Sequence, residues 1–443
     1  MLKVEVLKTI KGKQPMQCTN DAVCVDGDEI EANVINVVPD VEYQTIEGFG
    51  GAFTEAAAVT WSKLGDENKK EIMKLYFDAE YGAGYNMGRV HMNSCDFALG
   101  NYSCVEEGDE ALETFNIERD KQAVIPMIKA AMKYGNIDIM VSPWSPPPYM
   151  KTNGQMNDGG KLKKEYYELW SQFYVEFIKR YRKEGINVNR ITVQNEPKAV
   201  QKWDSCVYTA EEEAELVKNH LGEKMKDINV EILCWDHNKE RVYDRSKTII
   251  DIAGEYIGGT AFHWYSGDHF EELEMFHKVY PEKKLFFSEG CYEYSLGEKD
   301  TVMIGEKYAH DMIGNFNNYC NGFYDWNLLL DERGGPNHVG NFCDAPIMAD
   351  TKNDKIFIHD SYYYIKHMSA FVKKGAVRIG SSKFTDELDT IAFKNPNGSI
   401  VVIVLNRTEK NFESLFFRIK NETVTSSIEA HSIATFIFKS DNN

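Results

Sequence analysis

The sequence predicts an α/β protein built on a (β/α)8 TIM barrel, with a smaller all-β domain beside it. Two observations favour this fold class: strand-like segments alternate with longer helical patterns through the centre of the chain, and short β-branched segments follow one another near its end. The alternation counts eight strand-then-helix units, the number that closes such a barrel. The 443 residues suffice for a barrel of about 250 residues and a second unit.

Eight short apolar segments have the character of barrel strands. They are Glu47–Phe53, Asn86–Met92, Ile137–Ser142, Arg190–Gln194, Val230–Trp235, Gly259–Trp264, Lys284–Ser288 and Gly322–Trp326. Helical patterns occur between them at Asp120–Tyr134, Tyr166–Lys183, Ala210–Lys226 and Thr301–Tyr319. A strand followed by a helix is the repeating unit of a parallel barrel.

After the helix expected near Ser361–Phe371 the pattern changes. The strand-like segments there are Ile391–Phe393, Ser399–Leu405, Ser414–Ile419, Thr423–Ile428 and Ser432–Phe438, separated by turns such as Asn395–Gly398. We expect a small antiparallel β domain, joined by strand-like residues before Val41. Residues Ala98–Asn116 break the periodicity after the second barrel strand and are interpreted as a surface insertion, with a lid over the site as the alternative.

Composition excludes several classes of partner. The formal net charge of -19 opposes binding to nucleic-acid phosphates and anionic lipid headgroups, so we expect no nucleic-acid partner and no stable membrane anchor. The first residues lack the pattern of a secretory signal, and nine scattered cysteines suit reduced thiols, so we expect a cytoplasmic protein. Neither cysteine pairs nor histidines show zinc-ligand spacing, so we expect no metal and no organic cofactor.

Two glutamates stand directly after predicted strands. The fourth strand runs into Asn195-Glu196-Pro197, and the seventh runs into Glu289-Gly290. Residues at the carboxyl ends of barrel strands form the active site, and glycosidic cleavage needs two carboxylates across a cleft. Their separation decides between retention and inversion of the anomeric centre, so the residues alone leave both outcomes open. They predict a glycosidase that acts through Glu196 and Glu289.

Other strand ends carry aromatic and polar side chains that suit a sugar. Indole and phenol rings stack on the C–H face of a pyranose, and carboxylates, amides and imidazoles bind hydroxyls. The residues concerned are Asp96, Trp144, Asn195, His263, Tyr265 and Trp326. Their presence at most strand ends predicts a sugar-binding cleft.

Seven motifs, in order, resemble glycoside hydrolase family 30, and specifically its acid β-glucosidase (glucosylceramidase) branch. They are QTIEGFGGAFTEAAA (44–58), GRVHMNSCDF (88–97), SPWSPPPYMKTN (142–153), TVQNEP (192–197), AFHWY (261–265), FFSEG (286–290) and YDWNLLLDERGGPNHVGNF (324–342). The similarity extends from about Gln44 to Ser381. It implies a catalytic barrel over 44–372 and a β-sandwich built from residues 1–43 and 373–443.

The resemblance also implies roles for individual residues. Glu196 corresponds to the general acid/base and Glu289 to the nucleophile of a retaining, exo-acting β-glycoside hydrolase that releases a terminal β-linked glucosyl unit by double displacement. By position, Asp96 and Trp144 match residues that hold the far hydroxyls of that unit, and Asn195 matches the residue at the 2-hydroxyl. The remaining matches are His263 and Tyr265 beside the nucleophile, Trp326 at the pocket floor, Asn337 in the GGPN loop, and Arg89, which orients the carboxylates.

Two segments depart from the family pattern, Pro146–Tyr149 and Trp235–Asn238, and both border the aglycone side. The expected substrate is therefore a β-glucoside with an open choice of leaving group: an oligosaccharide, an aryl or alkyl glucoside, or a glycolipid. The alternatives are a β-xylosidase or β-1,6-glucanase of the same family, or a sugar-binding protein without catalysis. For the two roles we hypothesise that Glu289 stays ionised while a raised pKa keeps the proton on Glu196.

Overall fold

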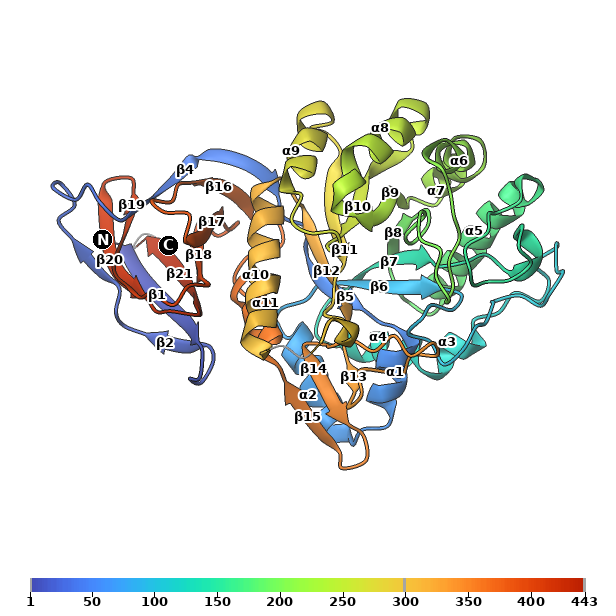
Figure 1. Ribbon diagram of the computed structural model, residues 1–443, viewed down its shortest axis with the longest axis horizontal. Coiled ribbons are helices and arrows are strands. Elements are labelled where there is room, and N and C mark those ends of the chain that lie inside the picture. Colours follow the sequence, from blue (N-terminus) through green and yellow to red (C-terminus); the bar gives the residue numbers. More distant parts are fainter. Residues whose placement is uncertain (1, 298–299, 441–443) are drawn as a thin grey trace.

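The computed structural model describes residues 2–297 and 300–440. A closed barrel forms one part of the molecule and a β-sandwich the other, with helices α10 (Thr301–Asn317) and α11 (Asp360–Ser369) standing between them (Figure 1). Both chain ends lie in the sandwich, and the long strand β4 (Val34–Thr45) leads from there to the barrel. This architecture confirms the predicted fold class.

Eight parallel strands close the barrel in chain order, and β12 pairs with β5 to complete the ring. The strands are β5 (Gly48–Ala52), β6 (Met87–Met92), β7 (Asp138–Pro143), β8 (Val188–Thr192), β9 (Glu231–Asn238), β10 (Ile257–His263), β11 (Lys284–Glu289) and β12 (Gly322–Asn327). Every predicted barrel strand overlaps one of them. At Gly50 a side chain would stand 2.1 Å from the Met87 carbonyl oxygen, so the close approach of β5 and β6 requires glycine there.

Side chains fill the interior of the barrel. A buried cluster from six of its strands is made of Met87, Met140, Leu233, Ala261, Phe286 and Tyr324. Below it Arg190 packs its guanidinium 4.0 Å from the centre of the Phe286 ring and forms ion pairs with Glu47 and Glu231. The barrel is therefore a packed core, and a substrate can be received only at an end.

Helices surround the barrel strands. Besides α10 and α11 they are α1 (Glu55–Ser62), α2 (Asp66–Phe77), α3 (Glu118–Gln122), α4 (Val124–Ala131), α5 (Tyr167–Lys183), α6 (Ala210–Leu216), α7 (Gly222–Asp227), α8 (Val242–Ala253) and α9 (Phe270–Val279). A π-helical turn over Val217–Leu221 links α6 to α7. Short 3-10 helices cover Pro148–Met150, Lys164–Tyr166, Lys239–Arg241 and Tyr294–Leu296.

The helical pattern predicted over Asp120–Tyr134 is present as two helices, because the chain breaks at Ala123 between α3 and α4. Pro126 explains the break: in an unbroken helix its ring would clash with the carbonyl group four residues earlier, whereas the first turn of a new helix accepts it. The other three predicted helices are present at or near their expected bounds.

The side domain is one hydrogen-bonded set of ten strands that folds over itself. In spatial order they are β2 (Gln17–Thr19), β1 (Leu2–Ile10), β21 (Ser432–Ser440), β18 (Ile400–Asn406), β17 (Leu388–Lys394), β16 (Val377–Ser381), β4, β19 (Phe412–Ile419), β20 (Glu422–Ile428) and β3 (Val23–Val25). The Phe417 ring on β19 lies 4.4 Å from that of Phe436 on β21, although four strands separate β19 from β21 in the set. This contact places the two halves face to face as a sandwich.

His367 of α11 connects the helical layer to the sandwich. It is fully buried, and its two ring nitrogens lie 2.8 Å from the hydroxyl groups of Thr435 and Thr9 on β21 and β1. Helix α11 therefore fixes the sandwich against the barrel.

A further small sheet follows the last barrel strand. It is made of β13 (Leu330–Asp331), β14 (Ile347–Asp350) and β15 (Lys355–Ile358).

The segment Ala98–Asn116 is irregular but anchored. Its side chains Val105, Leu112 and Phe115 belong to the main core cluster. At its start the Leu99 N–H donates a hydrogen bond of 2.7 Å to Glu55. Apolar anchoring of this kind supports the interpretation as a surface insertion. Among the described residues no helix is long and apolar enough to cross a membrane.

Candidate active site

A cavity of about 330 Å³ lies at the carboxyl ends of the barrel strands. Both predicted glutamates line it, with sugar-binding candidates around them. The full lining is Asp96, Trp144, Asn195, Glu196, Gln201, Trp203, His237, Asn238, Tyr265, Glu289, Cys291, Glu293, Trp326, Asn341 and Cys343. The structure thus brings together side chains from strand ends that are far apart in the sequence, as the barrel topology predicts.

Glu196 is held on a strained stretch of backbone. Its φ angle is 46°, in the left-handed region, and Trp235 and Asp236 across from it have φ angles of 71° and 52°. The Glu196 N–H donates a hydrogen bond of 2.9 Å to the Asp236 carbonyl oxygen, which ties the two strained turns together. Strain of this kind in non-glycine residues concentrates at functional sites, where it aims side chains.

Glu289 ends strand β11 and is held by two donors. Arg89 donates to Oε2 at 2.6 Å, and the Tyr265 hydroxyl donates to Oε1 at 3.0 Å. Hydrogen bonds to both oxygens fix the plane of the carboxylate and favour its ionised form.

Arg89 is fully buried and organises the floor of the site. Besides Glu289 it donates to Asp236 and Asn195, each at 2.9 Å, and to Ser142 at 3.1 Å. The rings of Trp144 and Trp326 stack 5.2 Å apart, and the guanidinium lies 4.8 Å and 5.4 Å from their centres. One cation therefore positions a carboxylate, an amide and the aromatic floor together.

His263 is fully buried beside the two glutamates, and it is not among the described residues that line the cavity. Its Nδ1 is 3.2 Å from Glu196 Oε1 and 4.0 Å from Glu289 Oε1, and its Nε2 is 3.0 Å from Asp236 Oδ1. The first two distances cap the separation of the two glutamate oxygens at about 7 Å. The imidazole thus connects the catalytic candidates from behind.

Charges around the pair shift its pKa values in the direction opposite to our hypothesis. Burial raises the pKa of Glu196, but the nearby His237 and His263 lower it more, and the net pKa lies below its usual value. Burial and the charge of Glu196 raise the pKa of Glu289 in spite of His263 and Arg89. Three carboxylates, that of Glu289 first, overcome burial and raise the pKa of His263 to about 9. In the unliganded protein the expected order of the two glutamates is therefore reversed, because two histidines flank Glu196.

Asn337 contacts Asp96, which lines the cavity, but is not itself among the described lining residues. The Asn337 amide donates a hydrogen bond of 3.3 Å to Asp96 Oδ2, while Asn341 and Cys343 of the same loop line the cavity. Burial, with Glu289 and Asp204 nearby, raises the pKa of Asp96 well above its ordinary value. A carboxyl group in this setting gains from hydrogen bonds that sugar hydroxyls supply.

Sequence reasoning missed several residues of the site, chiefly Asp236, His237 and Trp203. Asp236 is fully buried, and Arg89, Thr192, Ser288 and His263 all lie within hydrogen-bond distance of its carboxylate. A signal was present, because Asp236 stands at the end of the fifth barrel strand just as Glu196 and Glu289 stand at the ends of theirs.

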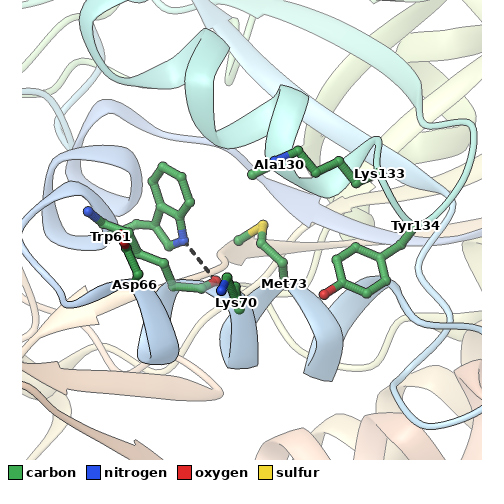
Figure 2. Close-up of a pocket in the computed structure, with 8 residues that line it drawn as sticks. Trp61, Asp66, Lys70, Met73, Ala130, Lys133 and Tyr134 are labelled. Atoms are coloured by element: carbon green, nitrogen blue, oxygen red, sulfur yellow. Dashed lines mark hydrogen bonds between the residues drawn. The ribbon is translucent and has the colours of Figure 1, made fainter.

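A second hollow, of about 200 Å³, lies outside the barrel between α2 and the end of α4 (Figure 2). Trp61, Met73 and Tyr134 face it, and the Trp61 indole donates a hydrogen bond to the Lys69 carbonyl oxygen. Asp66 is the single carboxylate among the described residues that line it. Glycosidic cleavage needs a pair of carboxylates, so this hollow is not a second catalytic site.

Two carboxylates share one sugar-sized cavity with stacked indoles at the mouth of a barrel, and this combination defines a glycoside hydrolase. Residues 46–372 match the glycosyl hydrolase family 30 TIM-barrel domain, and residues 375–436 match the family 30 β-sandwich domain. The chain belongs to glycosyl hydrolase family 30 and is an O-glycosyl hydrolase.

Three relatives place the chain within the family. It is 31% identical to the lysosomal acid glucosylceramidase of Mus musculus over 403 residues, which cover 85% of this chain and 78% of the relative. The crystal structure of SrfJ from Salmonella typhimurium is 35% identical over the full length of both chains, with a TM-score of 0.95. The endo-β1,6-glucanase BT3312 is 26% identical with a TM-score of 0.89, covering 99% of this chain and 100% of that one.

Proposed function

We propose that this protein is a retaining, exo-acting β-glucosidase that releases a terminal β-linked glucosyl unit by double displacement. The observation that carries the proposal is the different bonding of the two glutamates. Arg89 and Tyr265 donate to both oxygens of Glu289, whereas Glu196 faces two imidazoles at the rim of the same cavity. A carboxylate fixed by two donors suits a nucleophile, and one that faces groups able to exchange protons suits an acid/base.

The distance between the two glutamates is compatible with retention. Retaining enzymes place their carboxyl groups about 5–5.5 Å apart and inverting enzymes about 6.5–9.5 Å apart, to leave room for a water molecule. The upper limit of about 7 Å between Glu196 Oε1 and Glu289 Oε1 admits the retaining range, and the stereochemistry of the products tests the choice.

In the first step Glu289 attacks the anomeric carbon while Glu196 gives its proton to the leaving oxygen. In the second step Glu196 takes a proton from water, which attacks the same carbon and releases Glu289. The roles require Glu196 to be protonated in the substrate complex. A sugar that fills the cavity removes water from both carboxyl groups, which raises the pKa of Glu196 before the first step. Esterification of Glu289 then removes its charge, which lowers the pKa of Glu196 and lets it act as the base in the second step.

The roles are tested by removing each carboxylate and adding azide. Glu289→Gly should lose hydrolysis of an aryl β-glucoside and regain it with azide, giving the α-glycosyl azide. Glu196→Ala should be rescued most for poor leaving groups and give the β-glycosyl azide. Hydrolysis by either variant at the parental rate would show that its assignment is wrong.

A terminal glucosyl unit fits the end of the cavity that Asp96 and Trp144 form, where a hexose carries its 4- and 6-hydroxyls. A β-1,6-glucanase is the second candidate, because a structure with a TM-score of 0.89 belongs to an enzyme of that activity. Rates on aryl β-glucoside, β-xyloside and β-fucoside test the sugar unit. The products from a reduced β-1,6-glucan oligosaccharide test the mode of action: glucose alone supports the exo-acting proposal, and internal cleavage contradicts it.

A further inference from the structure

Glu196, His237 and His263 form a cluster of potential metal ligands beside the cavity, which Glu196 and His237 line. One ligand atom from each residue lies within 4.8 Å of the other two. Glu196 Oε1 is 3.2 Å from His263 Nδ1 and 3.6 Å from His237 Nδ1. Around a tetrahedral zinc ion, with bonds of about 2.1 Å, neighbouring ligand atoms lie about 3.4 Å apart. The Glu196 oxygen is thus already near the spacing that such an ion requires from each of the two imidazoles.

The imidazole of His237 is poised as a ligand. In the described part of the chain its Nδ1 is buried and has no hydrogen-bond partner. A buried polar atom without a partner is costly, and a ligand removes that cost. His237 also lines the cavity, so an ion can reach it from solvent.

Asp236 prepares His263 for the same role. Its Oδ1 lies 3.0 Å from His263 Nε2, and the neighbouring Ser288 and Thr192 hydroxyls and Arg89 hold the carboxylate in place. Because Nε2 faces Asp236, Nδ1 is the nitrogen that faces Glu196, and an ion bound there displaces the proton that Nδ1 carries below the raised pKa of His263. A carboxylate behind a ligating histidine is the usual support of a zinc site, since it fixes the ring and strengthens the ligand.

We propose that Glu196, His237 and His263 form a binding site for a zinc-class divalent cation and that an ion bound there competes with the sugar substrate. One oxygen and two imidazole ligands suit Zn²⁺, Cu²⁺ or Ni²⁺, whereas Mg²⁺ and Ca²⁺ prefer oxygen alone. Competition follows because Glu196 and His237 line the cavity that the sugar fills, so an ion bound to them occupies that space and takes the Glu196 oxygen that the proposed function assigns to proton transfer. The predicted inhibition of hydrolysis by the ion rests on the proposed function, whereas the predicted binding of the ion does not depend on it.

Binding is therefore measured first, without any substrate, by titration calorimetry of the full chain with Zn²⁺. We expect one site per chain, a loss of affinity of at least about tenfold in His237→Gln, and no comparable site for Mg²⁺. His431→Gln is the matched control, since His431 also contacts two glutamates, Glu306 through Nδ1 and Glu409 through Nε2, but on opposite sides of the ring. Unchanged zinc affinity in His237→Gln, or an equal loss in His431→Gln, overturns the proposed site.

Competition is measured second. With the parent protein, Zn²⁺ should raise KM for an aryl β-glucoside without lowering kcat, and a chelator should restore the original KM. Zinc that binds with the expected His237 dependence but leaves KM unchanged overturns the competition. If the chain binds zinc as expected but hydrolyses no glycoside, the proposed function fails while the metal site stands.

Discussion

Arg89→Met is the most informative single change at the floor of the site. The methionine fills most of the volume but removes the cation that pairs with Glu289 and Asp236, both buried. Leaving a buried charge without its partner costs about 3–5 kcal/mol of unfolding free energy. Because the charge-assisted hydrogen bond to Glu289 is lost as well, we expect kcat/KM to fall at least about 100-fold, or about 2.7 kcal/mol.

Arg190→Met is the matched control. Arg190 is also buried and also pairs with two carboxylates, those of Glu47 and Glu231, but at the opposite end of the barrel interior. It should lose less stability, because Glu47 and Glu231 are partly exposed and keep their ion pairs with Lys284, and it should keep kcat/KM within a few-fold. The assays are urea denaturation and steady-state hydrolysis of an aryl β-glucoside. Equal losses of activity in the two variants, or parental activity in Arg89→Met, would refute this reasoning.

Three further predictions concern other parts of the chain. Burial lowers the pKa of His367 to about 3, so its contribution to stability is intact above about pH 6.5 and is lost as the pH falls towards 3. Urea titrations of the parent protein should show about 2–3 kcal/mol of unfolding free energy lost by pH 4.5 for this reason. The variant His367→Gln should lose correspondingly less over the same pH range. Lys239 and Asp311 form a buried ion pair, so Lys239→Met should cost about 3–5 kcal/mol in urea denaturation, and the double variant Lys239→Met/Asp311→Leu clearly less than the two single losses together. Asp204 accepts hydrogen bonds from Ser94 and Asn101 and so holds the loop that carries Asp96. Because Asp96 is expected to bind the sugar and not to take part in proton transfer, Asp204→Asn should raise KM for an aryl β-glucoside more than it lowers kcat.

The strand-end rule was enough to find Glu196 and Glu289 from the sequence, because in a parallel barrel all such positions converge on one face. The same rule points to Asp236 but does not predict its contacts in the site. Those contacts depend on left-handed backbone angles at Trp235 and Asp236, which no local propensity favours. The sequence also could not show how the His263 ring is oriented. The pairing of β10 with β11 shifts register between Phe262 and His263, and the ring lies against Asp236.

The sequence did not show which strands of the side domain pair with one another, because that pairing joins segments far apart in the chain. Strand β1 pairs with β21, and Leu2 and Ser440 are opposite one another although they lie at the two ends of the chain. Alternating polarity marks the segment as a strand without showing its partner. The pKa order of the catalytic pair was missed for a related reason, since it depends on His237, which lies 41 residues after Glu196 in the sequence and beside it in the structure.

Trapping the covalent intermediate tests the central claim most directly. A 2-deoxy-2-fluoro-β-glucosyl fluoride carries a good leaving group and slows breakdown of the glycosyl-enzyme, so the label accumulates on the nucleophile. Peptide mass spectrometry should then find one fluoroglucosyl group per chain, on Glu289. A label on another residue, or steady hydrolysis of β-glucosides that gives the α-anomer first and leaves the protein unlabelled, would contradict the account.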